Sequence, residues 1–334
     1  MKTVMILAAG NVVASGISSF LDVFSFCNVY WKRIHPEAEN DLFHVHVVSP
    51  DGEPALTNQG FQIPATGIKE TDLNQADAVL LASAFVTDES ELMAFQRAFA
   101  PFVVPLTDYA KTGKPIAAYC SGTLVLASTG LMNGVKTTTV WWLTELFKQR
   151  FPQAHLCMDS LVVSDCQFHT AGATSSCLSL ALHMVEQLAG VQVAHQLSKV
   201  LLVAPNRSSQ QPFMTMSFQL EQHQDSQVQA VQEWMQQNLT SQINLDELAG
   251  QFAMGKRTLI RRFKSALNET PGSYWQKLRI DEAKRLLETT DMALEQIIDR
   301  VGYGDSASFR KLFQQQTSLS PRAYRAKFNS HTCC

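Results

Sequence analysis

Short apolar runs alternate with longer amphipathic stretches over about the first 200 residues. The apolar runs, which are rich in β-branched residues, fall at 3–8, 43–49, 78–82 and 115–119. The stretches between them have helical periodicity, as at 17–31 and 89–112. Strands that alternate with helices in this way form a mainly parallel sheet with helices on both faces. The pattern therefore predicts a doubly wound, flavodoxin-like α/β domain.

The pattern changes twice further along the chain. Between 206 and 229 the sequence is rich in Ser and Gln, and a stretch of such low hydrophobicity does not bury enough apolar surface to order itself. Helical periodicity returns at Val228, Val231 and Met235. We therefore expect a first domain at 1–213, a linker at 214–227 and a second domain at 228–328.

The second domain contains one pattern twice. The copies span 245–267 and 294–316, and each consists of a short helical segment, a turn and a second helical segment. Each copy is followed by a Thr-Pro or Ser-Pro pair and a tyrosine, at 270–274 and at 320–324. The repeat predicts an all-α domain with two helix-turn-helix motifs.

The second helix of each copy has an apolar face and a polar face. In the first copy Leu259, Phe263 and Leu267 recur every four residues and would dock on the domain. The opposite face carries Arg257, Arg261 and Lys264; the equivalent positions of the second copy hold Ala307, Lys311 and Gln314, with Arg310 at the edge. Such a face suits a reader of the major groove, because arginine can read base edges and any cation can hold a phosphate.

An amphipathic helix with three cations is also typical of an ordinary solvated surface. The duplication favours DNA, because two readers can meet one face of a duplex one turn, about 34 Å, apart. The distribution of charge along the chain also favours DNA binding. Residues 243–334 carry 15 Lys and Arg against 10 Asp and Glu, a net charge of +5, whereas residues 1–242 carry 12 against 20, a net charge of −8. The basic end of the chain is therefore suited to approach phosphates.

Amino-acid composition argues against a membrane protein, a disulfide-rich protein and a metal-binding protein. The apolar fraction of 46% is ordinary, and no run approaches the ~18 apolar residues that span a membrane. The seven cysteines are an odd number at irregular spacing, which matches neither a disulfide framework nor a metal motif. We expect no metal and no cofactor, no membrane partner, and a location in the reducing cytoplasm.

The segment from about 242 to 328 resembles the DNA-binding domain of the AraC/XylS family. The resemblance is carried mainly by Gly302-Tyr303-Gly304-Asp305-Ser306-Ala307-Ser308-Phe309-Arg310-Lys311-Leu312-Phe313 and Leu319-Ser320-Pro321-Arg322-Ala323-Tyr324-Arg325. It implies a linker helix at 271–287, double-stranded promoter DNA and RNA polymerase as partners, and sigma-factor-dependent promoters. The positions that it places at the bases or the groove are Arg257, Ile260 and Arg261 in the first module and Ser306, Ala307, Arg310 and Lys311 in the second. Ile260 and Ala307 cannot donate hydrogen bonds and would at most touch a thymine methyl.

One turn in the first domain has the layout of a nucleophile elbow. The strand at 115–119 leads into Cys120-Ser121-Gly122 and then into a helix, whose N-terminus would stabilise a thiolate. Cysteine is equally a common buried residue. Asn11 and Ser83 follow two other strands, and the carboxyl ends of parallel strands meet at one edge of a sheet. We therefore expect a crevice there.

Residues 1–213 resemble the PfpI-type, class I glutamine-amidotransferase-like fold, and the two domains together resemble the GlxA group of transcription regulators. The resemblance is carried by Cys120-Ser121-Gly122, Leu131-Met132-Asn133-Gly134, Thr137-Thr138-Thr139, Thr170-Ala171-Gly172 and Asn206-Arg207-Ser208-Ser209-Gln210. Enzymes of this fold activate the cysteine with a histidine, and many relatives have a glutamate in the first helix. Here Gly16 stands at the position of that acid, and Thr139-Val140-Trp141 lacks the histidine. Cys120 is therefore expected to be vestigial, with His169 as the one other candidate for a functional base.

These features predict a DNA-binding transcription regulator, an activator by family precedent, whose non-catalytic first domain senses a small metabolite and forms a homodimer. We expect the ligand near Asn11, Ser83, Cys120, Ser121 and Trp141. Trp141 and its neighbour Trp142 either offer an aromatic face to a cationic ligand, such as an amino acid or a quaternary amine, or belong to the core. The alternative is an amidase or hydratase that acts through Cys120 and carries a DNA-binding domain. A reactive thiolate would distinguish it.

Overall fold

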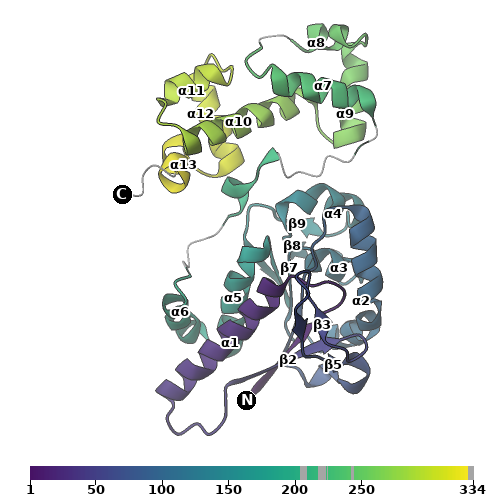
Figure 1. Cartoon of the computed structure of the whole chain (residues 1–334), viewed down its shortest axis with the longest axis vertical. Coiled ribbons are helices and arrows are strands. Elements are labelled where there is room, and N and C mark those ends of the chain that lie inside the picture. The colour runs from purple at the N-terminus through teal and green to yellow at the C-terminus, as the bar shows by residue number, and fades with distance from the viewer. Residues whose placement is uncertain (204–208, 217–222, 224, 242–243, 330–334) are drawn as a thin grey trace. The chain divides into compact units, whose positions relative to one another are not determined.

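The computed structural model divides the chain into two compact units, Met1–Gln210 and Gln211–Cys334 (Figure 1). It describes residues 1–203, 209–216, 223, 225–241 and 244–329. Part of the expected motif at 206–210 and part of the expected linker lie outside the described residues.

The first unit is built on a seven-stranded sheet with the order β10-β11-β7-β6-β1-β2-β5. Neighbouring strands are parallel except for β10 and β11, which are antiparallel. Every residue of β6 and β7 is buried, as expected for a sheet that is covered on both faces. The strands are β1 Lys2–Leu7, β2 Phe43–Ser49, β5 Thr66–Gly67, β6 Ala78–Leu81, β7 Ile116–Tyr119, β10 Val162–Asp165 and β11 Phe168–Ala171, and two short pairs are β3 Ala55–Leu56 with β4 Gln62–Ile63 and β8 Lys136–Thr137 with β9 His155–Leu156.

Helices cover both faces of this sheet. Figure 1 shows α1, α5 and α6 on one side, where they pack against one another, and α2 and α3 on the other. The prediction of a doubly wound, mainly parallel α/β domain is therefore confirmed. The helices are α1 Ala14–Ile34, α2 Glu89–Ala110, α3 Gly122–Ser128, α4 Thr144–Arg150, α5 Cys177–Ala189 and α6 Val191–Val200, with short 3₁₀ turns at Ile68–Glu70, Leu73–Gln75, Trp141–Leu143 and Thr174–Ser176.

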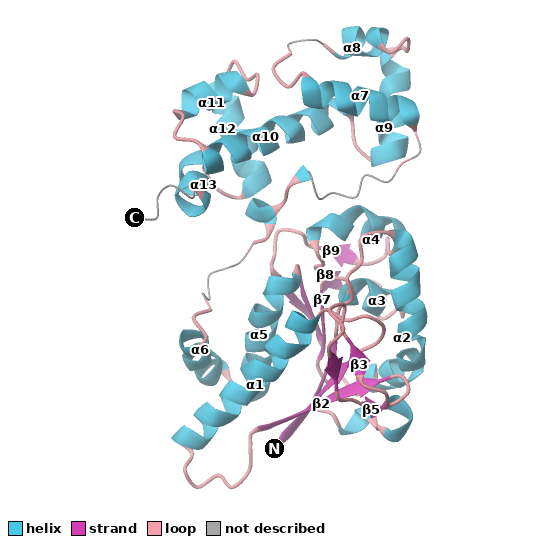
Figure 2. Ribbon diagram, in the orientation of Figure 1, coloured by secondary structure: helices cyan, strands magenta, loops and turns pink. Residues whose placement is uncertain are grey.

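The second unit consists of helices (Figure 2). Two helix-turn-helix modules, α8–α9 and α11–α12, are joined by α10, as the repeat predicted. Leu259 and Phe263 of α9 belong to one core with Tyr274, and Phe309 and Phe313 of α12 belong to a second core. The helices are α7 Ser226–Gln237, α8 Leu245–Gln251, α9 Lys256–Leu267, α10 Pro271–Thr289, α11 Leu294–Arg300, α12 Ser306–Thr317 and α13 Pro321–Phe328, after a 3₁₀ turn at Gln211–Phe213.

The start of the second unit differs from the expected linker. Pro212 O accepts a hydrogen bond from Tyr324 Oη at 3.3 Å, and the ring of Phe213 lies 5.1 Å from that of Phe328. The backbone N–H of Met216 donates to Asp281 of α10 at 3.2 Å. The physical reason is that apolar residues within this polar stretch cover the helical core. Residues 211–216 thus pack with the helices, α7 begins at Ser226, and the exact domain bounds stay a prediction.

Candidate nucleic-acid interface and ligand pocket

The first module presents its cations on the outer face of α9. Leu259 and Phe263 are fully buried, whereas Arg257, Arg261 and Lys264 are exposed. None of these three cations has an ion pair within the described part of the chain. Ile260 is half-buried at the edge of the face. The α9 face therefore has three cations available to a polyanion.

Arg262, on the same helix, has a structural role. Its Nε and Nη2 donate to the two carboxylate oxygens of Asp225 at 2.9 and 2.8 Å. Asp225 also caps α7, because it accepts hydrogen bonds from Gln227 N and Val228 N. The hydrogen bonds from Arg262, and then those from the two backbone N–H groups, hold the pKa of Asp225 below its usual value. The ion pair holds α9 against α7. Arg262 therefore does not belong to the exposed cationic face formed by Arg257, Arg261 and Lys264.

The second module offers fewer cations. Arg310 of α12 donates to Glu295 of α11 at 3.0 Å and to Ser306 Oγ at 3.1 Å. Lys311 and Ala307 are exposed, and Lys311 has no ion pair in the described ranges. The Arg310–Glu295 pair lies in solvent, where such pairs are weak, so a phosphate can replace the carboxylate. The structure therefore makes the two modules unequal in available charge.

Arg279 of α10 connects the two modules. Its guanidinium donates to Leu239 O at 2.8 Å and Ser241 O at 2.7 Å, in the loop after α7. On the other side it donates to Gly302 O at 3.3 Å, in the turn between α11 and α12. The guanidinium also lies over the ring of Trp275, at 4.9 Å from the centroid. This residue therefore ties the surroundings of both helix-turn-helix motifs to one point on α10.

Gly302 is required at that point. Its φ is +77°, and a Cβ there would lie 3.0 Å from both Leu239 O and Thr240 Cα. Any other residue would therefore be strained in its own backbone and would push the two modules apart.

In the first unit, Cys120 lies on a tight turn between β7 and α3. Its φ is +54°, and its N–H donates to Ala171 O at 3.0 Å and to Gly172 O at 2.9 Å. The predicted elbow is present in the backbone. The side chain, however, is buried, and burial raises the pKa of the thiol to about 12 although hydrogen bonds from Ser121 N and the Thr174 hydroxyl oppose the shift. At neutral pH Cys120 is a neutral thiol, whereas a nucleophile is a thiolate.

The ring of Tyr119 fills the space beside Gly16, where many relatives have a glutamate side chain. A Cβ on Gly16 would lie 1.8 Å from Tyr119 Oη and 2.5 Å from Tyr119 Cζ. The phenol is fully buried, faces the hydroxyl of Ser83, and has its pKa raised by burial. A carboxylate from α1 therefore has no room beside Cys120 unless Tyr119 leaves.

His169 does not replace the missing base. It pairs in register with Ala117 of β7, three residues before Cys120, which is roughly 10 Å along the strand. Its Nδ1 lies 2.9 Å from Ser164 Oγ and 3.1 Å from His183 Nε2. Burial lowers the pKa of His169 to about 4. The imidazole is neutral and is held by partners at the sheet edge.

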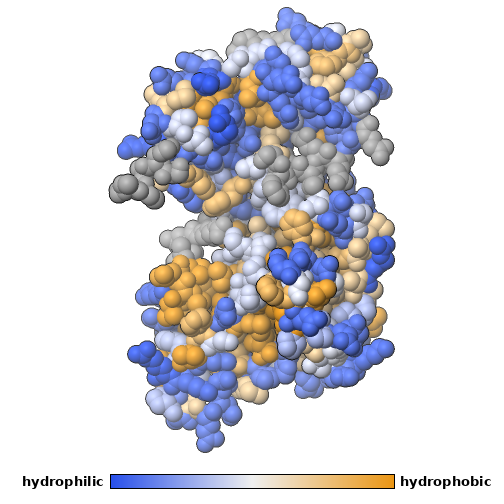
Figure 3. Space-filling view, viewed as in Figure 1, coloured by the Kyte–Doolittle hydropathy of each residue, from blue (hydrophilic) through white to orange (hydrophobic). Residues whose placement is uncertain are grey.

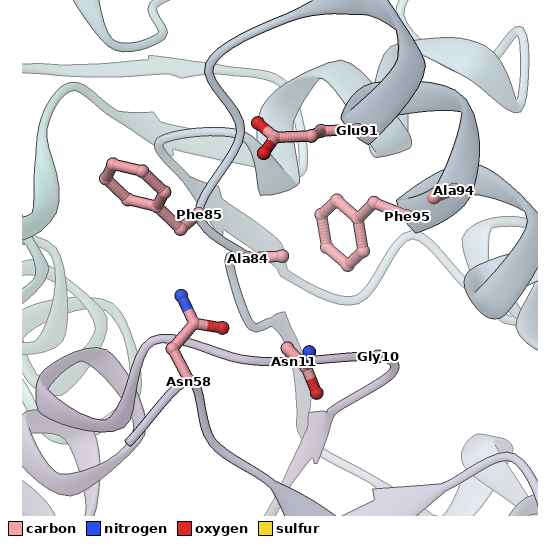
Figure 4. Close-up of a pocket in the computed structure, with 8 residues that line it drawn as sticks. All are labelled: Gly10, Asn11, Asn58, Ala84, Phe85, Glu91, Ala94 and Phe95. Atoms are coloured by element: carbon pink, nitrogen blue, oxygen red, sulfur yellow. The ribbon is translucent and has the colours of Figure 1, made fainter. Parts of the chain in front are cut away.

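An open pocket of about 410 Å³ lies beside the elbow. In Figure 4 the ring of Phe95 points into the space between the lining residues from one side, and Phe85 lies on the other side with its ring directed outward; Glu91 lies at one end, and the amides of Asn11 and Asn58 lie at the other. The remaining lining residues are Gly10, Ala84 and Ala94. The Glu91 carboxylate accepts hydrogen bonds from Thr87 N at 2.6 Å and Thr87 Oγ1 at 2.7 Å. The only formal charge in the lining is therefore negative.

The pocket contains one of the five expected ligand residues, Asn11. Ser121 is buried. Its hydroxyl donates a hydrogen bond to Ala84 O at 2.6 Å and accepts one from Ala84 N at 3.1 Å. The rings of Trp141 and Trp142 pack edge to face at 5.5 Å, and Trp141 is buried. The remaining two expected ligand residues, Ser83 and Cys120, are also buried and do not line the pocket. Trp141 is thus buried and Trp142 is half-buried, and the five expected ligand residues stay a prediction.

Sequence reasoning missed Asn58, Phe85, Glu91 and Phe95. The available signal was weak: Glu91 and Phe95 are one helical turn apart directly after β6 and its loop. Asn58 comes from a loop that only the fold brings to this edge. The described residues contain no group of three or more His, Cys, Asp or Glu that could hold a metal ion. In those same ranges no helix is long and apolar enough to cross a membrane.

Comparison with known proteins identifies both units. Residues 28–187 match the DJ-1/PfpI family, and residues 248–327 match a helix-turn-helix domain. The chain joins a DJ-1/PfpI domain to an AraC-type helix-turn-helix domain. Over the DJ-1/PfpI domain it is similar to the crystal structure of DJ-1beta from Drosophila melanogaster, with 21% identity, a TM-score of 0.50 and coverage of 61% of this chain and 98% of that one.

Relatives with similarity across both domains include two transcriptional regulators of Pseudomonas aeruginosa. The HTH-type transcriptional regulator CdhR of Pseudomonas aeruginosa is 26% identical over 298 residues, which cover 88% of this chain and 85% of that one. The HTH-type transcriptional regulator GbdR of the same species is 25% identical over 288 residues, which cover 85% of this chain and 75% of that one. The DJ-1/PfpI family also includes enzymes, so the state of the elbow has to be judged from this chain's own residues.

Proposed function

We propose that this protein is a DNA-binding transcription regulator that reads promoter DNA with α9 and α12 and responds to a small molecule bound by its DJ-1/PfpI domain. The observation that carries the proposal is the tandem helix-turn-helix domain with three cations on the exposed face of α9 that form no ion pair with any described residue. CdhR and GbdR, which have similarity over most of the chain, are named transcriptional regulators.

The two helix-turn-helix modules have different roles in DNA binding. Arg257 and Arg261 have the donors for base edges, so α9 supplies most of the sequence readout. On α12, Lys311 and the solvent-exposed Arg310 suit phosphates. Because Arg279 ties both modules to α10, the spacing of the two reading helices is fixed before DNA arrives.

The DJ-1/PfpI domain acts by binding and not by catalysis. The Cys120 thiol is protonated, Tyr119 occupies the space beside Gly16, and His169 is held elsewhere. An amidase or hydratase needs a thiolate with a base within hydrogen-bond reach.

The pocket suits a small organic cation. Glu91 supplies a carboxylate with no cationic partner in the described part of the chain, and the ring face of Phe95 attracts positive charge. Asn11 and Asn58 can orient a carboxylate or hydroxyl elsewhere on the ligand. This chemistry favours a basic amino acid or a quaternary amine.

Ligand and DNA are coupled through a change in population. A ligand that binds one arrangement of a homodimer more tightly shifts the protein towards it, and that arrangement presents α9 and α12 to its half-sites. Activation then follows when the bound dimer contacts RNA polymerase at the promoter.

The DNA assignment is tested by selecting binding sites with the full-length chain and measuring affinities for point variants of the selected site. Arg261→Ala should lose ~1–3 kcal/mol of discrimination at one base pair and little elsewhere. Arg285→Ala is the control, because Arg285 pairs with Glu282 on the linker helix. An Arg261→Ala protein that discriminates every position like the unchanged protein would refute the reading face.

The ligand assignment is tested by calorimetric titration of the full-length chain with arginine, choline and the uncharged choline analogue 3,3-dimethylbutanol. We expect a cation to bind and the uncharged analogue to bind at least tenfold more weakly. Glu91→Gln should remove that preference, whereas Glu89→Gln should not, because Glu89 pairs with Arg150 outside the pocket. Equal binding by the Glu91→Gln and unchanged proteins would place the ligand elsewhere.

A further inference from the structure

Two histidines and a serine form a triangle of polar atoms at the edge of the sheet. Ser164 of the edge strand β10 pairs in register with His169 of β11, so the two side chains lie on the same face of the sheet. Ser164 Oγ lies 2.9 Å from His169 Nδ1 and 2.8 Å from Nε2 of His183, on helix α5. The two ring nitrogens are 3.1 Å apart. Three atoms that can each donate a lone pair therefore converge from three elements.

Hydrogen bonds do not satisfy all three contacts at once. Burial lowers the pKa of both histidines, that of His169 to about 4, so both rings are neutral at pH 7. A neutral ring nitrogen either donates or accepts. With one ring hydrogen between the nitrogens and one hydroxyl hydrogen, two hydrogens serve three contacts, and one contact is left without a hydrogen of its own. A cation bound by all three lone pairs would remove this conflict.

The surroundings of the triangle are mainly apolar. The neighbours of His183 on α5 include buried Leu180 and Met184, and Figure 3 shows apolar residues gathered over the region of α1, α5 and α6. His169 is only 4% exposed, whereas His183 is half-buried and Ser164 is exposed. Polar groups in apolar surroundings are costly unless they have partners. Because Ser164 is exposed, the triangle has one side through which an ion can enter from solvent.

The distances within the triangle indicate which kind of ion fits. At a metal–ligand bond of ~2.1 Å, two atoms 2.8–3.1 Å apart subtend about 85–95° at the metal. Such angles belong to one face of an octahedron, whereas tetrahedral zinc would separate its ligand atoms by about 3.4 Å. Imidazole nitrogens prefer late transition metals to Mg²⁺ or Ca²⁺, and affinity rises along the series to Ni²⁺ and Cu²⁺. The geometry and the ligand types together favour an ion of the Ni²⁺ class.

We propose that His169 Nδ1, His183 Nε2 and Ser164 Oγ form one face of a binding site for a divalent transition-metal ion of the Ni²⁺ class, with water at the remaining positions. Each ring then carries its proton on the nitrogen that faces away from the ion, so binding requires a change of tautomer and no loss of a proton. Glu186, one helical turn after His183, adds negative charge beside the site, and its charge already acts on His183.

The third ligand of this site is a hydroxyl, which is a weaker ligand than a carboxylate or an imidazole. We therefore expect an ion that exchanges with the medium. Sequence spacing did not indicate the site, because its three residues lie on three different elements. The inference goes beyond the proposed function and does not depend on DNA or on the organic ligand.

The test is a calorimetric titration of the untagged full-length chain with NiCl₂ in a buffer that does not bind metals. We expect one ion per chain, and His183→Gln should weaken binding at least ~10-fold, because it removes a ligand. His44→Gln is the matched control, since His44 lies beside His46 on β2, with ring centroids 4.0 Å apart, and belongs to a different histidine pair. No binding by the unchanged protein, unchanged binding by His183→Gln, or loss of binding in His44→Gln would each overturn the proposal.

A gain of affinity separates metal binding from a purely structural role of the three residues. Ser164→Asp places a carboxylate beside the two imidazoles, which is a ligand set that holds divalent ions on one octahedral face. Ser164 is exposed on an edge strand, so the domain should still fold. Nickel binding should tighten at least ~10-fold, and the gain should disappear when His183→Gln is added. A Ser164→Asp protein that binds Ni²⁺ no better than the unchanged protein would contradict the shared face.

The visible absorption of bound Co²⁺ reports the coordination number directly. Six-coordinate Co²⁺ absorbs weakly, whereas four-coordinate Co²⁺ absorbs strongly. We expect the weak spectrum from the unchanged full-length protein, and no protein-dependent change from His183→Gln. A strong four-coordinate spectrum would refute the octahedral face derived from the distances.

Discussion

Arg279 offers the sharpest test of how the two DNA-reading modules are held together. Arg279→Met keeps most of the side-chain length and removes every donor. The side chain donates to three carbonyls, at 2.8, 2.7 and 3.3 Å, and hydrogen bonds from charged groups contribute about 1.5–3 kcal/mol each. The third bond is long and the guanidinium is partly solvated, so the two short bonds decide the loss. We expect the helical unit to be destabilised by about 3 kcal/mol.

Hydrogen exchange on the full-length chain measures this locally. Peptides from α10 to α12 report the opening free energy of the helical unit, so unfolding of the other domain does not enter. Arg285→Met is the control on the same helix and should change little, because Arg285 is exposed and its one ion pair within the described residues is with Glu282 one turn earlier. The affinity for a full DNA site should also fall for Arg279→Met. A loss of less than about 1 kcal/mol in these peptides would refute the role of Arg279 as a connection between modules.

Three further outcomes follow from the DJ-1/PfpI domain. Because burial raises the pKa of Cys120 to about 12, iodoacetamide at pH 7 should label exposed Cys166 long before Cys120. Mass spectrometry of the peptides measures the two rates. Fast labelling of Cys120 would instead favour the enzyme alternative. Gly16→Glu should destabilise the domain in thermal unfolding and create no amidase activity, since Tyr119 fills the space; a stable, active variant would contradict the geometry. His169 has a folded pKa of about 4 against ~6.5 when unfolded, so below pH 6.5 the unfolded chain takes up a proton that the folded chain does not. Stability should therefore fall as pH drops from about 6.5 to about 4, by up to about 3 kcal/mol, and His169→Asn should flatten that part of the denaturation profile.

Much of this protein could be predicted from local sequence. The helix-turn-helix modules at 245–267 and 294–316 follow from helical periodicity, from the Pro residues at 271 and 321 that begin helices, and from the repeat itself. The alternation of apolar runs with amphipathic stretches determined the α/β domain, and the elbow at Cys120 follows from a strand that runs directly into a helix. These features depend on residues within one or two turns of one another, and short-range periodicity encodes them directly.

The site depended on contacts that sequence spacing does not encode. The phenol of Tyr119 occupies the space beside Gly16, the pocket combines Asn58 with Glu91 and Phe95, and Arg279 connects loops from both sides of α10. In each case side chains from distant segments meet only after the strands and helices have packed. Short-range patterns along the chain therefore specify which elements form and which helix face carries charge. The burial of Cys120 as a thiol and the position of the open pocket beside it arise in the folded domain, because burial and charge partners are properties of the packed chain.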